Sequence, residues 1–206
     1  MAKDVLARVA APRAWQRMLS GRRLDLLDPS PMDIEIEDIA HGLARVARWN
    51  GQTKGEHIFS VAQHSLLVEA FASKLEPRLS PRDKMIVLLH DAPEYVVGDI
   101  ISPFKAVLSD AYKAVENRIL AAVHLRFGLP AQVPIGLAKL CKQADKAAAY
   151  CEATALADFE HAEAEKFFGL PRVRLANLEA LLAPQTSDLA EAEFLSRFRA
   201  LETECG

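Results

Sequence analysis

The sequence of 206 residues contains no apolar run that approaches the roughly 20 residues needed to cross a bilayer. Its first 20 residues mix charged side chains with short apolar pieces and lack the apolar core of a secretory signal. We therefore expect a cytoplasmic protein without a membrane partner. The formal net charge of −3 provides no broad basic surface, so a long nucleic acid is not an expected partner either.

Cysteine is scarce, with three residues and no Cys-x-x-Cys pair. Cys141 and Cys151 are predicted to lie on one helix, where ten residues separate them by about 15 Å. That separation is too long for a disulfide bond. We expect three free thiols in a reducing compartment, and we assign none of them a catalytic role.

Alternating strand patterns are almost missing, and only Ile34-Glu35-Ile36 shows one. Apolar residues instead recur at helical spacing, and Ser80-Pro81 has the composition of a helix start. Gly21 to Asp33, rich in Asp, Pro and Ser, indicates an extended lead-in. The predicted helices cover 37–47, 61–75, Ser80 through the His90-Asp91 pair, Ser109 to Gly128, 135–156, 175–182 and a last one from Thr186 or Ser187. These features predict an all-α fold, a single-domain irregular helical bundle over residues 1–206.

Metal-capable side chains end the apolar run 85–89, where His90 and Asp91 are adjacent and Glu94 follows one helical turn later. Burying charged groups is costly unless they are paired or coordinate a metal, so this grouping needs a cause. His64, on the apolar face of the 61–75 helix, and Asp145, beside small residues of the 135–156 helix, are two further candidates. A divalent ion would account for all of them.

Each candidate also has an ordinary explanation. A lone histidine on an apolar face is more often a hydrogen-bonded core residue, and Asp145 could form an ion pair with Lys142 or Lys146. Together, two imidazoles and two carboxylates suit Mn, Co, Fe, Ni or Zn better than a metal that prefers thiolates. Such an ion lowers the pKa of a bound water and polarises a phosphoryl oxygen. Glu94 could orient or deprotonate that water.

The same residues carry a family resemblance. An upstream His, a His-Asp pair and a distant Asp are the pattern of HD-domain metal-dependent phosphohydrolases. The chain resembles the bacterial 5′-deoxynucleotidase branch of that superfamily most closely, over a metal-site core of about residues 40–155 with helical additions at both ends. The segments that carry the resemblance are 63–66, 90–94, 98–99, 102–105 and 142–145.

The resemblance implies one divalent metal ion, Mn, Co, Fe, Ni, Zn or Mg, with four protein ligands: His64, His90, Asp91 and Asp145. It implies that Glu94 acts on the water or the phosphate and that Asp99 contacts the sugar or positions the nucleophile. Arg48 and Trp49 match an Arg-Trp pair that contacts phosphate and shapes the sugar pocket, and Lys105 is a weaker candidate to neutralise phosphate.

The expected activity is a phosphomonoesterase that releases phosphate from a nucleoside or deoxynucleoside 5′-monophosphate, its small phosphorylated partner. Two alternatives stay open: a pyrophosphohydrolase of an alarmone or nucleoside triphosphate, and a non-catalytic helical module that binds metal. The resemblance also suggests a homodimer. The segment 51–57 departs from the family pattern and leaves the sugar preference undetermined, and we expect its His57 to be a solvated loop residue.

Overall fold

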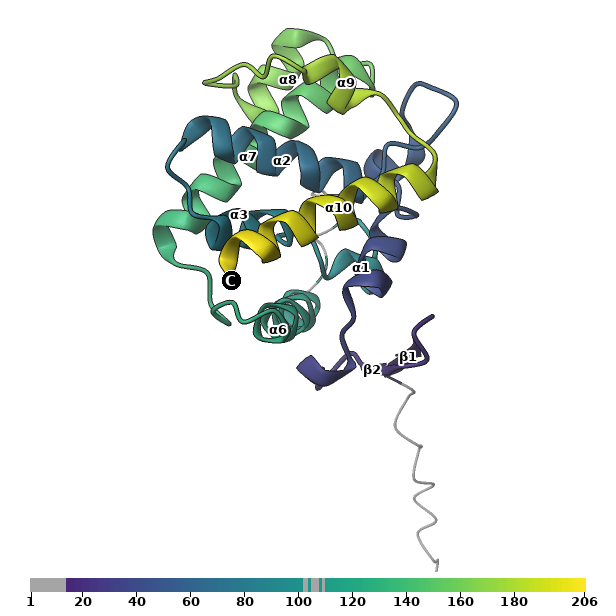
Figure 1. Cartoon of the computed structure of the whole chain (residues 1–206). Helices are drawn as coiled ribbons and strands as arrows, with labels where there is room; N and C mark the ends of the chain where they lie inside the picture. Colours follow the sequence, from purple (N-terminus) through teal and green to yellow (C-terminus); the bar gives the residue numbers. More distant parts are fainter. Residues whose placement is uncertain (1–13, 102–103, 105–107, 109) are drawn as a thin grey trace, which may run out of the picture.

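The computed structural model describes residues 14–101, 104, 108 and 110–206, and over these residues it is an all-α bundle with one small hairpin (Figure 1). The strands are β1 (Trp15–Arg17) and β2 (Arg23–Asp25), and the short 3-10 turns are η1 (Pro31–Asp33) and η2 (Arg48–Gly51). The helices are α1 (Ile36–Leu43), α2 (Val61–Leu75), α3 (Pro81–Leu88), α4 (Glu94–Val97), α6 (Asp110–Arg126), α7 (Ile135–Ala155), α8 (His161–Phe168), α9 (Leu178–Leu182) and α10 (Ser187–Cys205).

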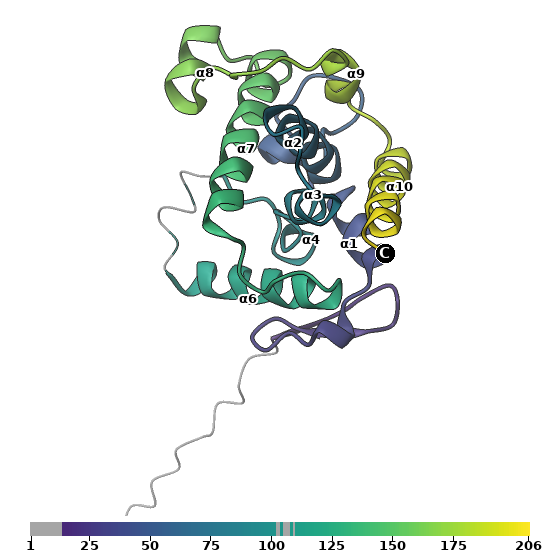
Figure 2. The same ribbon diagram turned by 60° about the vertical axis from the view of Figure 1, so that its left-hand side comes forward.

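Helix α2 lies at the centre of the bundle, between α7 on one side and α10 on the other (Figure 2). Helices α1 and α3 complete the layer between them, and α6 closes one end. The core contains Phe59, Phe71, Phe194 and Phe198, each almost completely buried. No helix among the described residues is long and apolar enough to span a membrane.

Hydroxyl caps define where three of the predicted helices begin. The side chains of Ser60, Ser80 and Thr186 accept hydrogen bonds from backbone N–H groups in the first turns of α2, α3 and α10. Pro81 occupies the first turn of α3, where a missing N–H costs nothing. These helices confirm the sequence interpretation, as does α7, which begins at Ile135.

Two predicted helices end earlier than expected. Helix α1 stops at Leu43, because the chain then turns and Ala47 forms an isolated antiparallel bridge with Ser60. Helix α3 stops at Leu88, so His90 and Asp91 lie in a turn and not on the helix itself. Pro93 has no N–H and disfavours helical backbone in the residue before it, which accounts for the break.

The remaining differences concern short elements. Gly21 to Asp33 contains β2 and η1, whereas an extended lead-in was expected, and Ile34-Glu35-Ile36 forms no strand. Helix α9 covers only the end of the predicted 175–182 helix, and α8 was not predicted. Ser109, the expected cap of α6, lies outside the described residues.

Candidate metal centre

The structure brings the four predicted ligands together from three segments of the chain. His64 extends from α2, His90 and Asp91 from the turn after α3, and Asp145 from α7. His64 Nε2 lies 3.4 Å from Asp145 Oδ1 and 3.5 Å from Asp91 Oδ2, and His90 Nε2 lies 3.2 Å from the same Asp91 oxygen. We call these four residues the His–Asp cluster.

Hydrogen bonds hold both imidazoles with the same atom facing the cluster. His90 Nδ1 lies 2.9 Å from the carbonyl oxygen of Val87, and His64 Nδ1 lies 2.5 Å from Glu152 Oε1. A carbonyl or an ionised carboxylate can only accept, so each Nδ1 carries a proton, and in the neutral ring each Nε2 has a lone pair. Both Nε2 atoms are buried and form no hydrogen bond to the described residues.

Three of the four cluster residues offer donor atoms that could share one cation, and Asp91 is not in this grouping. One donor atom each from His64, His90 and Asp145 lie within 4.8 Å of one another. Donors about 2.1 Å from a metal lie at most about 4.2 Å apart, so small side-chain rotations would close the site. His64 is completely buried, whereas the Asp145 side chain is 40 % exposed, so the cluster opens to the surface on the α7 side.

The electrostatics of the cluster favour positive charge between its carboxylates. Burial alone would raise the pKa of Asp91, but the neighbouring imidazoles of His90 and His64 hold that pKa well below its usual value. Burial and the charge of Arg48 lower the pKa of His64, yet the carboxylates of Glu152, Asp145 and Asp91 outweigh them and raise it. An environment that stabilises an imidazolium also stabilises a bound divalent cation.

The Asp145 carboxylate faces His64, and no ion pair joins it to Lys142 or Lys146 within the described part of the chain. The ordinary explanation for Asp145 therefore does not hold. The other ordinary explanation, a core histidine held by hydrogen bonds, applies only in part. Among the described residues, His64 and His90 each form a hydrogen bond at Nδ1 and none at Nε2.

Arg48 is held between two carboxylates. Its Nη1 donates to Asp99 Oδ2 at 2.8 Å, and its Nε donates to Glu152 Oε2 at 3.3 Å. Burial would lower the pKa of Arg48, but the carboxylates of Glu152, Asp99, Asp91 and Glu94 raise it. Only 14 % of the side chain is exposed, so Arg48 is not a solvated surface residue.

The residue after Arg48 adopts a left-handed backbone. Trp49 has φ 57° and Asn50 φ 52°, a region that non-glycine residues rarely occupy. This turn directs the Trp49 indole toward Phe159 and Phe168, with ring centroids 5.6 and 5.8 Å away. Trp49 Nε1 donates to Glu152 Oε2 at 2.9 Å. The Arg48-Trp49 pair thus lies within reach of the cluster through one shared carboxylate.

Glu94, the predicted acid, is 2 % exposed and begins α4, immediately after the turn that carries His90 and Asp91. Its charge contributes to the raised pKa of Arg48, so Glu94 lies close enough to interact with Arg48 electrostatically.

Helix α4 can approach α1 closely because residue 42 is glycine: a Cβ there would lie 2.7 Å from Tyr95 Cβ.

Three other residues considered from the sequence are settled only in part. Asp99 forms an ion pair with Arg48, and its contact with the sugar or nucleophile stays a prediction. Lys105 lies outside the described residues. His57 is half-buried, whereas a solvated loop residue was expected.

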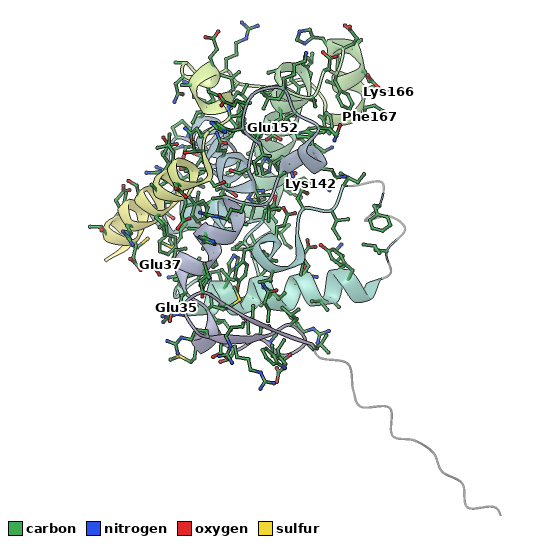
Figure 3. The ribbon with its side chains drawn as sticks, turned by 90° about the vertical axis from the view of Figure 1, so that its right-hand side faces the viewer. Glu35, Glu37, Lys142, Glu152, Lys166 and Phe167 are labelled. Carbon is green, nitrogen blue, oxygen red and sulfur yellow. The ribbon has the colours of Figure 1, made fainter. Side chains whose placement is uncertain are left out.

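Glu152 is the site residue that sequence reasoning missed. It lies on α7, where Figure 3 labels it. Its side chain is completely buried and accepts hydrogen bonds from His64, Trp49 and Arg48. Burial would raise its pKa, but the charges of His64 and Arg48 lower it to about 2. The available signal was its spacing, two helical turns after Asp145 on the same helix.

Comparison with known proteins agrees with this geometry. The family model described as HD domain matches residues 41–166. An uncharacterised protein of Rhodobacter capsulatus is 59 % identical over 159 residues, which cover 77 % of this chain and 81 % of that protein. The uncharacterised protein YfdR of Escherichia coli is 39 % identical over 98 residues, 48 % of this chain and 49 % of YfdR. HD domains are generally metal-dependent hydrolases, and a His–His–Asp grouping is compatible with that chemistry. This chain belongs to the HD-domain family.

Proposed function

We propose that this protein is a metal-dependent phosphohydrolase that binds one divalent ion through the His–Asp cluster and releases phosphate from a nucleoside or deoxynucleoside 5′-monophosphate. The observation that supports it best is the pair of buried Nε2 atoms of His64 and His90. Among the described residues neither atom has a hydrogen-bond partner, although both lie 3.2 to 3.5 Å from carboxylate oxygens. Leaving two such groups unsatisfied is costly in a core that binds nothing.

The protein groups around the cluster have distinct parts in the proposed reaction. When bound, a divalent ion acidifies a water and neutralises charge on phosphoryl oxygens. Glu94, buried at the start of α4, is proposed to accept the proton of the attacking water. The open side of the cluster near Asp145 is where substrate would enter.

Arg48 is proposed to bind the phosphate through Nη2. Asp99 holds Nη1 and Glu152 holds Nε, while Nη2 makes no hydrogen bond to any described residue. Two carboxylates thereby fix the plane of the guanidinium before substrate arrives, which reduces the cost of ordering it. The same two acids balance the Arg48 charge, so this site provides less excess positive charge than a triphosphate requires.

The nearby cations also favour a monophosphate over a larger anion. Lys54, the other described candidate for a phosphate contact, forms an ion pair with Asp158 instead. Its side chain is 62 % exposed. We therefore rank a 5′-deoxynucleotidase-like activity above pyrophosphate hydrolysis.

A phosphate-release screen tests the proposed function. Nucleoside and deoxynucleoside 5′-monophosphates, sugar phosphates, a nucleoside triphosphate and an alarmone are each assayed with Mn, Co, Mg and Zn, using Asp91→Ala as the inactive control. We expect turnover of monophosphates by the unmodified chain and none by the control. Pyrophosphate release from the larger substrates would favour the pyrophosphohydrolase, and activity on none would favour a non-catalytic metal-binding module.

A further inference from the structure

Glu152 is a buried carboxylate that accepts from three donors on two different elements. Its Oε1 accepts from His64 Nδ1 on α2, and its Oε2 accepts from Trp49 Nε1 and Arg48 Nε on η2. The side chain has no exposed surface. A carboxylate is rarely buried in this way unless every oxygen is used, and here both are.

We propose that Glu152 is a positioning residue that fixes the His64 imidazole for metal binding and attaches it to the Arg48-Trp49 pair. The proposal rests on the metal site of the proposed function and names a residue of this chain that tunes it. The Glu152 carboxylate accepts a hydrogen bond from His64 Nδ1, so this nitrogen keeps its proton. The other ring nitrogen, Nε2, then faces Asp91 and Asp145 and is available to bind a metal. A carboxylate behind a metal-binding histidine also sets the ring orientation and increases the basicity of the nitrogen.

The second carboxylate oxygen of Glu152, Oε2, holds the turn that contains Arg48 and Trp49. Arg48 and Trp49 lie in a turn with left-handed backbone at two successive residues, which needs support from its surroundings. Both of their side chains donate to Oε2. One carboxylate therefore sets the position of the His64 ring and of the two residues proposed to contact substrate.

Glutamine cannot replace this carboxylate, although its size is almost the same. An amide offers one acceptor oxygen and one NH₂ donor group, whereas the site presents donors on both sides. If the oxygen faces Trp49 and Arg48, the NH₂ faces His64 Nδ1 and favours the tautomer with its proton on Nε2. If the oxygen faces His64, the NH₂ meets the indole and guanidinium donors. Either arrangement disturbs one half of the site.

Co²⁺ binding tests the proposal without any need for turnover. The affinity of the full chain for Co²⁺ is measured by competition with a chelator, and its visible absorption spectrum reports the ligand geometry. We expect Glu152→Gln to weaken Co²⁺ binding by about 10- to 100-fold and to change the spectrum. Glu152→Asp keeps two acceptor oxygens on a shorter stem, so it should restore part of the lost affinity.

Glu69→Gln is the matched control, because Glu69 is another buried carboxylate of the α2 region, hydrogen-bonded to Arg197 and Ser73 and not to the cluster. It should lower the melting temperature of the metal-free protein and leave Co²⁺ affinity unchanged.

The possible outcomes distinguish loss of the positioning role of Glu152 from absence of a metal site. Affinity of Glu152→Gln within twofold of the unmodified chain overturns the positioning role, as does an equal loss in Glu69→Gln. If the unmodified chain binds no Co²⁺, Mn²⁺ or Zn²⁺, the proposed function and the positioning role of Glu152 are both overturned. If Glu152→Gln does not fold, the Asp variant decides: a threefold or greater loss supports the role, and unchanged affinity overturns it.

Discussion

Helix α2 buries a charged group against each of its two neighbours, and the two contacts are satisfied very differently. Against α10, Glu69 accepts two hydrogen bonds from Arg197, at 2.9 and 3.1 Å, and one from Ser73 at 2.7 Å. Against α7, His64 is satisfied at Nδ1 alone, and its Nε2 lies among carboxylates without a hydrogen bond. The first contact is complete within the protein, whereas at the second the Nε2 atom lies 3.4 and 3.5 Å from two carboxylate oxygens, a looser contact that a bound cation would complete.

This difference separates a charged group that is buried to stabilise the fold, Glu69, from one that is buried in a binding site, His64. A paired ion in a core contributes modestly to the free energy of unfolding, and it needs nothing from outside. Unsatisfied groups at the second contact reduce stability unless a ligand completes them, so their presence indicates binding. Metal binding should therefore depend on the α2–α7 contact and stability on the α2–α10 contact.

The largest expected effect is loss of metal from the α2–α7 contact. His64→Ala, Asp91→Ala and Asp145→Ala each remove a proposed ligand, so purified variants should contain almost no divalent metal by atomic emission. Arg197→Leu, on the other side of α2, should retain the metal content of the unmodified chain. Metal retained in all three ligand variants would place the ion elsewhere.

Glu94→Gln should separate chemistry from binding inside the same region. If Glu94 accepts the proton of the attacking water, its amide variant should bind metal normally and lose about 10²- to 10⁴-fold in kcat. Steady-state kinetics and metal content are measured on the same preparation. A variant that loses metal as completely as Asp91→Ala would make Glu94 a ligand.

Arg197→Leu should have its effect on stability. Glu69 would lose two charge-assisted hydrogen bonds while its side chain stays 7 % exposed, which costs about 1.5–3 kcal/mol in the free energy of unfolding. Urea denaturation of the metal-free protein measures it. Arg199→Leu removes a surface pair with Glu37 and should cost at most about 1 kcal/mol. Equal costs for the two variants would mean that burial of the Glu69 pair has no consequence.

Gly42→Ala tests the α1–α4 contact, because α1 packs on α10 as well as on α4, the helix that begins at Glu94. The new Cβ would lie 2.7 Å from Tyr95 Cβ and 2.9 Å from the Tyr95 carbonyl oxygen, so a helix must shift, at a cost of about 1–3 kcal/mol. Because Tyr95 follows Glu94, kcat should fall as well. Gly136→Ala is the control, since its Cβ would meet no atom within 4 Å. Thermal denaturation and kcat are compared for both, and a neutral Gly42→Ala would contradict the tight contact.

Arg48→Lys should have the smallest effect, about tenfold in kcat/KM on the best monophosphate. An ammonium group cannot keep the contacts to Asp99 and Glu152 while it also binds phosphate. Arg45→Lys changes an arginine on the surface of α1 that pairs with Asp188 and Glu191, and it should leave kcat/KM unchanged. Unchanged kinetics for both would remove Arg48 from the substrate site.

The sequence predicted long elements with a regular pattern. Helices α2 and α7 have apolar residues at helical spacing, and the caps Ser80 and Thr186 identify their own helix starts. The cluster residues were identifiable because adjacent His and Asp after a buried apolar run are unusual. In each case the information lies within a few residues along the chain.

The missed elements depend on contacts that are distant in sequence or too short to show a period. Strands β1 and β2 have three residues each, and α8 buries only Ala164. Glu152 has partners 88 to 104 positions away. Its spacing from Asp145 places both on one face of α7, but that spacing does not identify these partners. Local patterns cannot report such a contact.

The three thiols of the chain differ enough in accessibility to give it a natural labelling site. Burial and nearby carboxylates raise the pKa of Cys141 to about 12 and that of Cys151 to about 11, whereas Cys205 is exposed near the end of α10. A maleimide dye should therefore modify Cys205 first, because the thiolate is the reactive form. A single fluorophore there would report the docking of α10 on the bundle without occupying the His–Asp cluster.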